Sequence, residues 1–163
     1  MKLNLGCGTD YQEGYVNVDM YSDSQVDARF DISAVPYEDN SVDEIRAYHV
    51  IEHFDYKQAH LVLKEWHRVL KPGGTIRIET PDFLESCKDF ITADEDRRWK
   101  LYGHFFSEAW RPGFVHKFLF IESELHKALT WAGFTDIVRL EPTSGYLAEL
   151  PANLFLNMQG TKR

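Results

Sequence analysis

Two spacings of hydrophobic residues alternate along the chain, one typical of helices and one of strands. From Tyr56 to Leu70 the apolar side chains recur every three or four residues, which predicts one buried face of an amphipathic helix. Shorter runs rich in β-branched and aromatic residues indicate strands at 3–5, 15–19, 28–32, 42–51, 75–80, 136–140 and 154–159. Strands separated by helices favour an α/β fold with a mostly parallel sheet and right-handed crossovers.

Helix-breaking and helix-capping residues mark where the helices begin and end. The segment Lys71-Pro72-Gly73-Gly74 should stop the first helix, because it offers a basic last turn, a proline and two glycines. Asp82 is a suitable N-cap for a second helix. Ser123 is the predicted N-cap of a third helix, and Gly133 is the residue expected to close it.

Length and composition fit one globular domain spanning residues 1–163. Hydrophobic residues make up 44% of the chain and charged residues 27%, which excludes an intrinsically disordered protein. No apolar run approaches the roughly 20 residues that cross a bilayer, and the first residues do not resemble a signal peptide. Cys7 and Cys87 form no disulfide or zinc pattern. We therefore expect a soluble cytoplasmic protein without a membrane partner.

The net charge of −8 lies entirely in the N-terminal part of the chain. Residues 1–60 contain 12 Asp and Glu against 4 Lys and Arg, whereas the remainder is electrically balanced. Proteins bind a phosphate backbone with clustered Lys and Arg, so DNA and bulk RNA are not expected as partners. The balanced part of the chain is the better place for a bound substrate.

A glycine turn and two acidic residues follow the first strands of the predicted sheet. Gly6-Cys7-Gly8 comes directly after the strand 3–5, where missing side chains let a ligand approach the backbone. Asp19 ends the second strand, where a carboxylate can bind two ribose hydroxyls, and Asp31 lies near the end of the third. The turn lacks the third glycine of the dinucleotide fingerprint, so an ordinary strand-ending turn and a solvated Asp31 are the alternatives.

At these residues the sequence resembles the class I S-adenosylmethionine (SAM)-dependent methyltransferases, and in particular a compact, type 11-like subgroup. The similar segments are, in the order of the family, Leu3–Gly8, Val16–Asp19, Phe30–Ile32 with Val35–Asp43, Tyr48–His53, Val69–Gly74 and Ala132–Phe134. Each motif is short, but their joint order is specific. The resemblance implies a Rossmann-like, doubly wound, mostly parallel sheet of seven strands whose last strand is antiparallel.

The resemblance also implies which residues bind the cofactor and act on the substrate. SAM would be the methyl donor and S-adenosylhomocysteine the product. The implied cofactor contacts are Leu5, Gly6, Cys7, Gly8, Asp19, Met20, Asp31, Ile32, Tyr48 and His49. Transfer from an activated sulfonium mainly requires alignment, and a base is optional. From a pool that also holds Asp82 and His104, we expect His49 and His116 to be the catalytic residues.

The connection between the first two strands departs from the family pattern. Only 11 positions separate Gly8 from Asp19, which is too few for a full crossover helix, so we predict a loop or a single turn. Tyr11, Gln12 and Tyr15 are candidates to cover the methionine end of the cofactor, or they serve as packing or surface residues. The compact subgroup is often described beside polysaccharide-modifying enzymes, which makes a glycan one candidate acceptor.

The segment from His49 to His53 also spells H-x-x-E-H, the signature of inverted zinc peptidases. That signature needs both histidines and the glutamate on one helix, with a further ligand from elsewhere. Here the segment follows a β-rich stretch, and no motif marks another ligand. We therefore predict that no metal is bound, and a zinc peptidase remains a remote alternative.

Residues 82–117 lie outside the family motifs and combine aromatic with basic side chains. Such side chains can stack on sugar rings or bases, or the aromatics can simply cover the sheet. The segment Trp110–His116 contains a Pro-Gly pair, and we interpret it as a lid over the site. We predict methyl transfer to a hydroxyl, amine or carboxylate of a small molecule or glycan held here. A non-catalytic nucleoside- or SAM-binding module is the alternative class.

Overall fold

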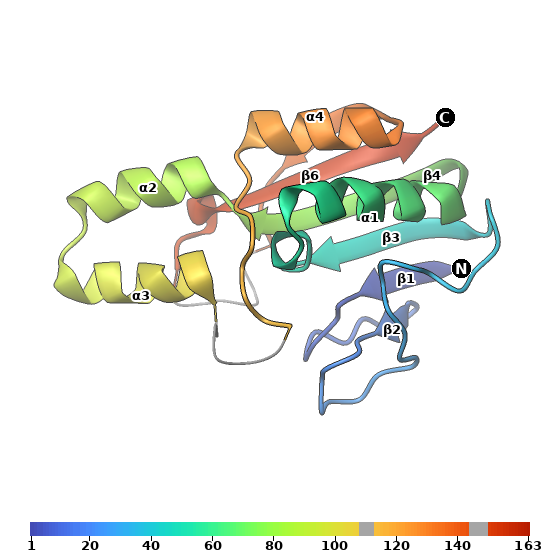
Figure 1. The fold of residues 1–163 in the computed structure, drawn as a ribbon, viewed down its shortest axis with the longest axis horizontal. Helices are drawn as coiled ribbons and strands as arrows, with labels where there is room; N and C mark the ends of the chain where they lie inside the picture. Colours follow the sequence, from blue (N-terminus) through green and yellow to red (C-terminus); the bar gives the residue numbers. More distant parts are fainter. Residues whose placement is uncertain (108–112, 144–149) are drawn as a thin grey trace.

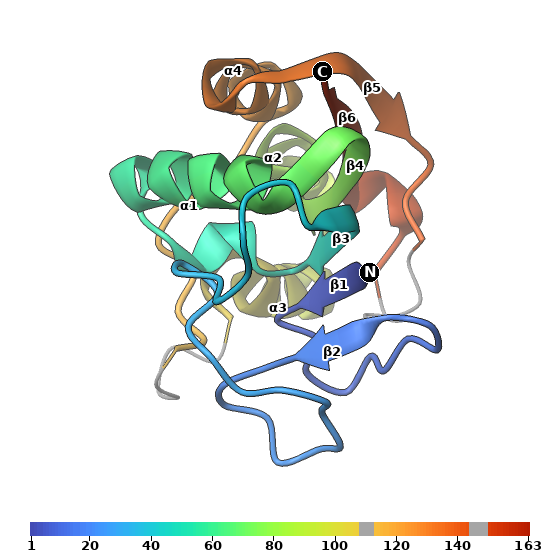
Figure 2. The ribbon, with the colours of Figure 1, turned by 90° about the vertical axis from the view of Figure 1, so that its right-hand side faces the viewer.

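The computed structural model describes residues 1–107, 113–143 and 150–163, which contain one six-stranded sheet. Its strands are β1 (Lys2–Leu5), β2 (Val16–Val18), β3 (Val42–Tyr48), β4 (Leu70–Pro81), β5 (Phe134–Leu140) and β6 (Phe155–Lys162). They follow the order β2-β1-β3-β4-β6-β5, and the first four are parallel to one another (Figure 2). β6 runs antiparallel to both of its neighbours, which confirms the prediction for the last strand.

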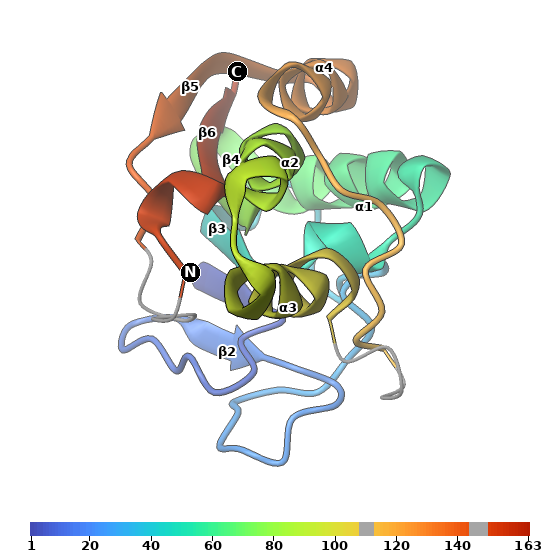
Figure 3. The same cartoon turned by 90° about the vertical axis from the view of Figure 1, so that its left-hand side faces the viewer.

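Four helices and two short 3₁₀ helices connect these strands in the described part of the chain. They are α1 (Tyr56–Val69), α2 (Phe83–Thr92), α3 (Glu95–Phe106), α4 (Glu122–Ala132), η1 (Ile51–His53) and η2 (Ala152–Leu154). α1 and α4 lie side by side on one face of the sheet (Figure 1). α2 and α3 form a hairpin that projects beyond the carboxyl ends of β3 and β4 (Figures 1 and 3). The arrangement is a Rossmann-like α/β fold, as predicted.

Helix α1 shows how the hydrophobic pattern builds the core. Asp55 caps its N-terminus, because its side chain accepts the N–H of Gln58 while the Gln58 side chain accepts the N–H of Asp55. The apolar stripe of the helix is buried, and Trp66 is fully buried within it. The indole N–H of Trp66 donates to the carbonyl of Ile32 at 2.8 Å. The helix therefore also fixes the loop that follows β2.

Two of the three other predicted helix boundaries are confirmed. The side chain of Asp82 caps α2, and Gly133 ends α4 with a left-handed φ of +110°. The prediction that Ser123 is an N-cap is wrong. Helix α4 begins at Glu122 after Ile121, which has no side chain that accepts a hydrogen bond, so Ser123 lies inside the first turn.

The predicted third strand, 28–32, is wrong. Only an isolated parallel bridge between Ala28 and Val18 forms there, and the described sheet has six strands instead of seven. The chain turns at Asp31, whose carbonyl accepts the N–H of Ala34 at 3.0 Å. This turn ends the pairing before a ladder can form.

The predicted loop in place of the first crossover helix is confirmed, since residues 6–15 contain turns and no helix. β3 ends at Tyr48 instead of reaching residue 51, because His49 adopts a left-handed φ of +56° that interrupts the extended backbone. β4 begins earlier than predicted, so residues 71–74 belong to the first part of that strand.

The two faces of the sheet differ in polarity. Ile45 and Ile76 point into the core that the sheet shares with α1 and α4, and both are fully buried. The next position on each strand holds Arg46 and Arg77, which point to the opposite face because side chains alternate along a strand.

The helices of the described residues are too short or too polar to span a bilayer.

Candidate active site

The glycine turn after β1 packs against the residues that follow β3. Gly6 has a φ of +67° and Gly8 a φ of +52°, and the N–H of Cys7 donates to the last residue of β2 at 3.0 Å. A Cβ atom on Gly6 would lie 2.4 Å from Cγ2 of Val50, so only glycine fits at this position. Because Val50 follows His49 directly, the glycine turn and the histidine segment are neighbours.

Asp19 ties the end of β2 to the glycine turn. Its Oδ2 accepts the N–H of Gly8 at 2.9 Å, and its Oδ1 accepts the N–H groups of Tyr21 and Ser22 at 2.7 Å each. The hydroxyl of Ser22 donates back to the carbonyl of Gly8 at 3.0 Å. A carboxylate has about four acceptor positions, so these three bonds orient it and leave one position for a ligand hydroxyl.

Three of the predicted cofactor contacts, Met20, Asp31 and Ile32, lie on the loop after β2. Met20 and Asp31 are exposed, and Oδ1 of Asp31 accepts both the N–H and the hydroxyl of Ser33. Ile32 is half-buried, and its carbonyl is bound by Trp66. No hydrogen bond of the described residues links Asp31 to the glycine turn, so its role at the cofactor stays a prediction.

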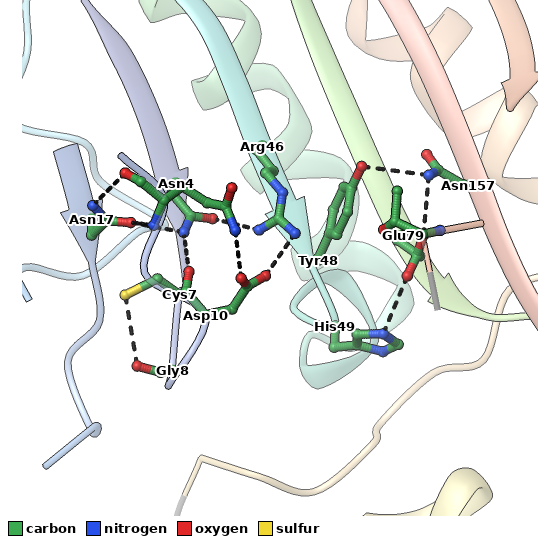
Figure 4. A network of polar contacts seen from close by, with 12 residues as sticks. Asn4, Cys7, Gly8, Asp10, Asn17, Arg46, Tyr48, His49, Glu79 and Asn157 are labelled. Atoms are coloured by element: carbon green, nitrogen blue, oxygen red, sulfur yellow. Dashed lines mark hydrogen bonds and ion pairs between the residues drawn. The ribbon is translucent and has the colours of Figure 1, made fainter. Parts of the chain in front are cut away.

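A polar network takes the place of the missing crossover helix (Figure 4). The side-chain amide of Asn4 donates to the carbonyl of Asp10 at 2.7 Å and to Oδ1 of Asn17 at 2.9 Å. Arg46 on β3 donates to Oδ1 of Asn4 at 3.0 Å and to Oδ2 of Asp10 at 2.6 Å. Its guanidinium also stacks 3.6 Å from the centre of the Tyr48 ring. These contacts fasten the loop between β1 and β2 to three strands.

The residues expected to cover the methionine end of the cofactor have partners within the protein. The hydroxyl of Tyr15 donates to Glu44 at 2.5 Å, and that of Tyr11 donates to Asp27 at 3.0 Å. The side chain of Gln12 donates to Asp10 at 2.5 Å. These contacts fit the alternative interpretation, in which the three side chains pack the loop.

His49 lies between two buried carboxylates. Its Nδ1 is 3.5 Å from Oε1 of Glu52. Its Nε2 is 3.7 Å from Oε1 of Glu79, the contact drawn in Figure 4. The backbone N–H of His49 donates to the carbonyl of Glu79 at 2.7 Å, and Phe155 contacts the imidazole edge-on. Burial alone would lower the pKa of His49, but the two carboxylates outweigh it and raise the pKa to about 9.

Glu52 is the centre of a cluster of histidines. It is fully buried, and its Oε2 accepts the hydroxyl of Thr80 at 3.0 Å. Burial would raise the pKa of Glu52, but His49 holds it below its usual range. Nε2 of His116 lies 3.9 Å from Oε1 of Glu52. The carbonyl of Glu52 accepts the N–H of Lys117 at 2.8 Å, which fixes the segment carrying His116 against η1.

His116 and His104 are linked behind this cluster. Nδ1 of His116 donates to the carbonyl of His104 at 3.0 Å, and Nε2 of His104 donates to the carbonyl of Leu154 at 3.2 Å. Burial lowers the pKa of both histidines, that of His104 to about 4. His104 also packs edge-on against Phe155, so it holds His116 and Phe155 in place beside the cluster. The structure thus brings the two predicted catalytic histidines, His49 and His116, to the same glutamate.

The H-x-x-E-H segment does not form one helix. Glu52 and His53 lie in η1, whereas His49 precedes it with a left-handed φ.

Asp82, another candidate proton acceptor, has a structural role. Its side chain caps α2 and accepts a hydrogen bond from Arg139 at 3.2 Å.

Glu79 is a member of the site that the sequence did not indicate. It lies on β4, where no motif marks it, and it reaches His49 only because the β3–β4 register places it opposite Tyr48. Its Oε2 accepts from Asn157 at 3.0 Å and from the N–H of Thr143 at 2.7 Å. Two strand residues, Glu79 and Asn157, and the loop residue Thr143 therefore hold one side of His49.

The fold and the site define an α/β protein with a ligand site at the carboxyl ends of its parallel strands. The family model described as a methyltransferase domain matches residues 3–78, which include the glycine turn, Asp19 and the His49–His53 segment. Residues 3–78 are therefore similar to a type 11 methyltransferase domain, a kind of domain that uses SAM as its methyl donor.

Solved structures share this fold over nearly the whole chain. A SAM-dependent methyltransferase from Archaeoglobus fulgidus has a TM-score of 0.66 at 17% identity, and the match covers 99% of this chain and 85% of that one. A Thermotoga maritima methyltransferase, described as a possible histamine N-methyltransferase, has a TM-score of 0.63 at 19% identity, with 99% and 81% covered. A chain of the Haloferax volcanii complex between the Trm112 activator and a putative methyltransferase gives 0.62 at 18% identity, with 98% and 81% covered. No curated protein matches the chain.

The thiol of Cys7 should react far more slowly in the folded protein than in the unfolded chain. Burial, reinforced by the charge of Asp19, raises the pKa of Cys7 to about 11. A rise of about two pKa units leaves roughly a hundredfold less of the reactive thiolate at a given pH. The rate of iodoacetamide labelling of the Cys87→Ser variant, measured in buffer and in denaturant at pH 8, tests this. Equal rates in the two conditions would contradict it.

Proposed function

We propose that this protein is a SAM-dependent methyltransferase that acts on a hydroxyl, amine or carboxylate of a small molecule or a glycan. The observation that supports this is the contact of Gly6 with Val50, which joins the glycine turn to the segment carrying His49 and Glu52. An acceptor held beside the histidine cluster therefore lies next to the cofactor turn. Ionisable side chains at that place suit an acceptor that loses a proton when it is methylated.

The residues at the glycine turn fit a nucleoside cofactor. The turn presents backbone without side chains at two positions, and the Asp19 carboxylate keeps one acceptor position for a hydroxyl. The contacts that we propose are Leu5, Gly6, Cys7, Gly8, Asp19, Met20, Asp31, Ile32, Tyr48 and His49. In this arrangement Asp19 binds the ribose, the loop around Asp31 lies on the adenine side, and His49 lies toward the methyl group.

The protein then has three tasks in the reaction. Bound SAM supplies a methyl group that its sulfonium already activates. The chain aligns the acceptor with that group and excludes water. We propose that His49, whose two ring nitrogens face Glu52 and Glu79, holds these carboxylates in place beside the acceptor. His116 has Nδ1 committed to a carbonyl, so its Nε2 is the atom that handles the acceptor's proton.

Residues 82–117 are the proposed acceptor side, and their described part contains the hairpin of α2 and α3. It stands at the carboxyl ends of the strands (Figure 3). Phe83 and Phe90 both contact Phe105, which gives the hairpin its own small core. Trp99 is 77% exposed and does not cover the sheet. This aromatic surface, with its neighbouring arginines, suits a sugar or an anionic small molecule better than a nucleic acid.

The predicted lid is described only in its second half, because residues 110–112 lie outside the described residues. That second half is attached to the site. Nδ1 of His53 donates to the carbonyl of Val115 at 3.1 Å, and the N–H of Lys117 donates to Glu52. These two bonds support a role for this segment at the acceptor.

Replacing Asp19 with alanine should weaken SAM and S-adenosylhomocysteine binding by about 1.5–3 kcal/mol, the range for hydrogen bonds to a charged group. Isothermal titration calorimetry measures the loss. Asp23→Ala is the matched control, because Asp23 is an exposed carboxylate of the same loop without a hydrogen bond among the described residues. If neither ligand gives heat with the unmodified protein, the proposed function is wrong.

Transfer of a labelled methyl group separates an enzyme from a SAM-binding module without turnover. A panel of amines, phenols, carboxylates and oligosaccharides, incubated with [methyl-³H]SAM, is the direct assay. The amine members are included partly because one structural neighbour is described as a possible histamine N-methyltransferase. We expect label on at least one class, and His116→Ala should lower turnover while cofactor affinity stays nearly unchanged. Cofactor binding with no transfer to any acceptor would favour the binding module.

A further inference from the structure

Three side chains from two parts of the chain converge at the histidine cluster. Glu52 and His53 come from η1, and His116 comes from the segment that leads to α4. One potential ligand atom from each of these three residues lies within 4.8 Å of the other two. We call this set the Glu52–His53–His116 cluster. Compared with the H-x-x-E-H signature, it contains the distant His116 in place of His49.

One carboxylate oxygen of this cluster accepts no hydrogen bond from the described residues. Glu52 is fully buried, yet its Oε1 accepts no hydrogen bond from the described residues. His49 Nδ1 at 3.5 Å and His116 Nε2 at 3.9 Å face this oxygen at ion-pair distances. A buried polar atom that accepts no hydrogen bond is destabilising, and more so when it is charged. Such an atom is expected where a ligand completes the site.

The two histidines are oriented as metal ligands usually are. Nδ1 of His53 contacts the carbonyl of Val115 at 3.1 Å, and Nδ1 of His116 contacts the carbonyl of His104 at 3.0 Å. A carbonyl oxygen only accepts, so each Nδ1 carries the hydrogen and each Nε2 carries the lone pair. Metal-bound histidines typically use one ring nitrogen for the metal and donate the other to a backbone carbonyl or a carboxylate.

We propose that the Glu52–His53–His116 cluster binds a divalent transition metal ion of the zinc type. Two imidazoles and one carboxylate are an established donor set for zinc, and three protein ligands leave a fourth position open. Tetrahedral ligands about 2.0–2.1 Å from zinc lie roughly 3.4 Å apart, so the side chains need to close by about 1 Å or less on average. This inference contradicts the sequence-based prediction that no metal is bound.

The open position gives the metal a role in the proposed methyl transfer, and this part rests on the proposed function. An acceptor hydroxyl bound there would lose its proton more easily, because a divalent cation stabilises the oxyanion. With Nε2 of His116 bound to the metal, the proton released by the acceptor would pass to water or buffer. Binding of the metal itself does not depend on the identity of the acceptor or on methyl transfer.

The test measures metal binding directly. The full chain is stripped with a chelator and titrated with Zn²⁺ by calorimetry and with Co²⁺ by visible absorption, whose d–d bands report a four-coordinate nitrogen and oxygen site. We expect one equivalent of each ion. Glu52→Gln, His53→Ala and His116→Ala should each weaken binding by more than about a hundredfold, which exceeds the effect of losing an outer-shell partner. His126→Ala, an exposed histidine on α4, is the matched control and should bind normally.

The other outcomes are equally informative. No stoichiometric binding by the unmodified chain, or binding that His53→Ala and His116→Ala leave intact, overturns the inference. Loss in His49→Ala and His53→Ala with full binding in His116→Ala would instead assign the metal to the H-x-x-E-H segment. Circular dichroism checks that each variant folds. If buried Glu52→Gln does not, half-buried His53→Ala still decides the result.

Failure of this inference and failure of the proposed function are distinguishable. SAM titration of the metal-free protein reads the cofactor site alone. Cofactor binding without any metal site would refute only the metal. A metal site in a chain that binds neither SAM nor S-adenosylhomocysteine would refute the methyltransferase mechanism and leave the metal site standing.

Discussion

Replacing Gly6 with alanine should lower the free energy of unfolding by about 3 kcal/mol and abolish measurable SAM binding. The φ of +67° costs a residue with a side chain about 1–2 kcal/mol. The new Cβ would lie 2.4 Å from Cγ2 of Val50, and such overpacking typically costs about 1–3 kcal/mol more. The turn must therefore move, and it carries the N–H of Gly8 that orients Asp19. Denaturant unfolding and calorimetry with S-adenosylhomocysteine measure the two effects.

Gly14→Ala is the matched control for this variant. Gly14 has a φ of +82°, but a Cβ there would meet no described atom within 4 Å. It should lose only the roughly 1–2 kcal/mol of backbone strain and should bind SAM normally. Adding Val50→Ala to Gly6→Ala removes the methyl groups in the way and should recover part of the stability, which a double-mutant cycle quantifies. Equal losses at the two glycines would show that contact with Val50 is unimportant.

Residues close in sequence account for most of the correctly predicted fold. Helix α1 follows from its apolar spacing and the Asp55 capping box, and α4 ends where Gly133 allows a left-handed turn. The missing strand at 28–32 shows the limit of this reasoning. Phe30 and Ile32 are partly buried against the core at alternate positions, as a strand would place them, but no ladder of hydrogen bonds accompanies them. The alternating hydrophobic pattern correctly indicated that these side chains are partly buried. It did not show whether the segment pairs with a neighbouring strand.

The sequence predicted the parts of the candidate site whose positions depend only on where the strands end. The glycine turn and Asp19 meet because parallel strands β1 and β2 end at the same edge of the sheet. The partners of His49 were not predictable in the same way. Glu79 depends on the register of β3 with β4, and His116 reaches Glu52 through a segment far along the chain. Neither contact leaves a short-range pattern in the sequence.

The short first crossover shows how a compact member of the fold compensates for a missing helix. In the larger arrangement a helix would cover the strand ends and hold the cofactor turn by its packing. Here the loop has few apolar residues to bury, and side-chain hydrogen bonds from Asn4, Asn17 and Arg46 hold it instead. Stability of the cofactor turn should therefore depend on a few polar side chains, each with a large individual effect.

Replacing Arg46 with leucine should lower the free energy of unfolding by about 2–4 kcal/mol and weaken SAM binding. The substitution leaves Asp10 without its cation and Oδ1 of Asn4 without its donor, and it removes the stacking on Tyr48. Breaking a buried ion pair costs about 3–5 kcal/mol, and the range is lower here because the Arg46 and Asp10 side chains are 14% and 28% exposed. Urea unfolding and titration calorimetry read the two effects.

Arg77→Leu is the matched control, since Arg77 lies directly opposite Arg46 in the β3–β4 ladder but is exposed. Among the described residues its side chain donates only to Gln159. It should change stability by about 0.5 kcal/mol or less. Asp10→Asn completes a double-mutant cycle with Arg46→Leu, and a coupling of at least about 1 kcal/mol is expected if the two side chains act as one unit. Equal small losses of stability at Arg46 and Arg77, or additive effects in the cycle, would mean that the loop keeps its conformation without these side-chain contacts. The cofactor turn would then owe its position to Gly6 and Asp19 alone.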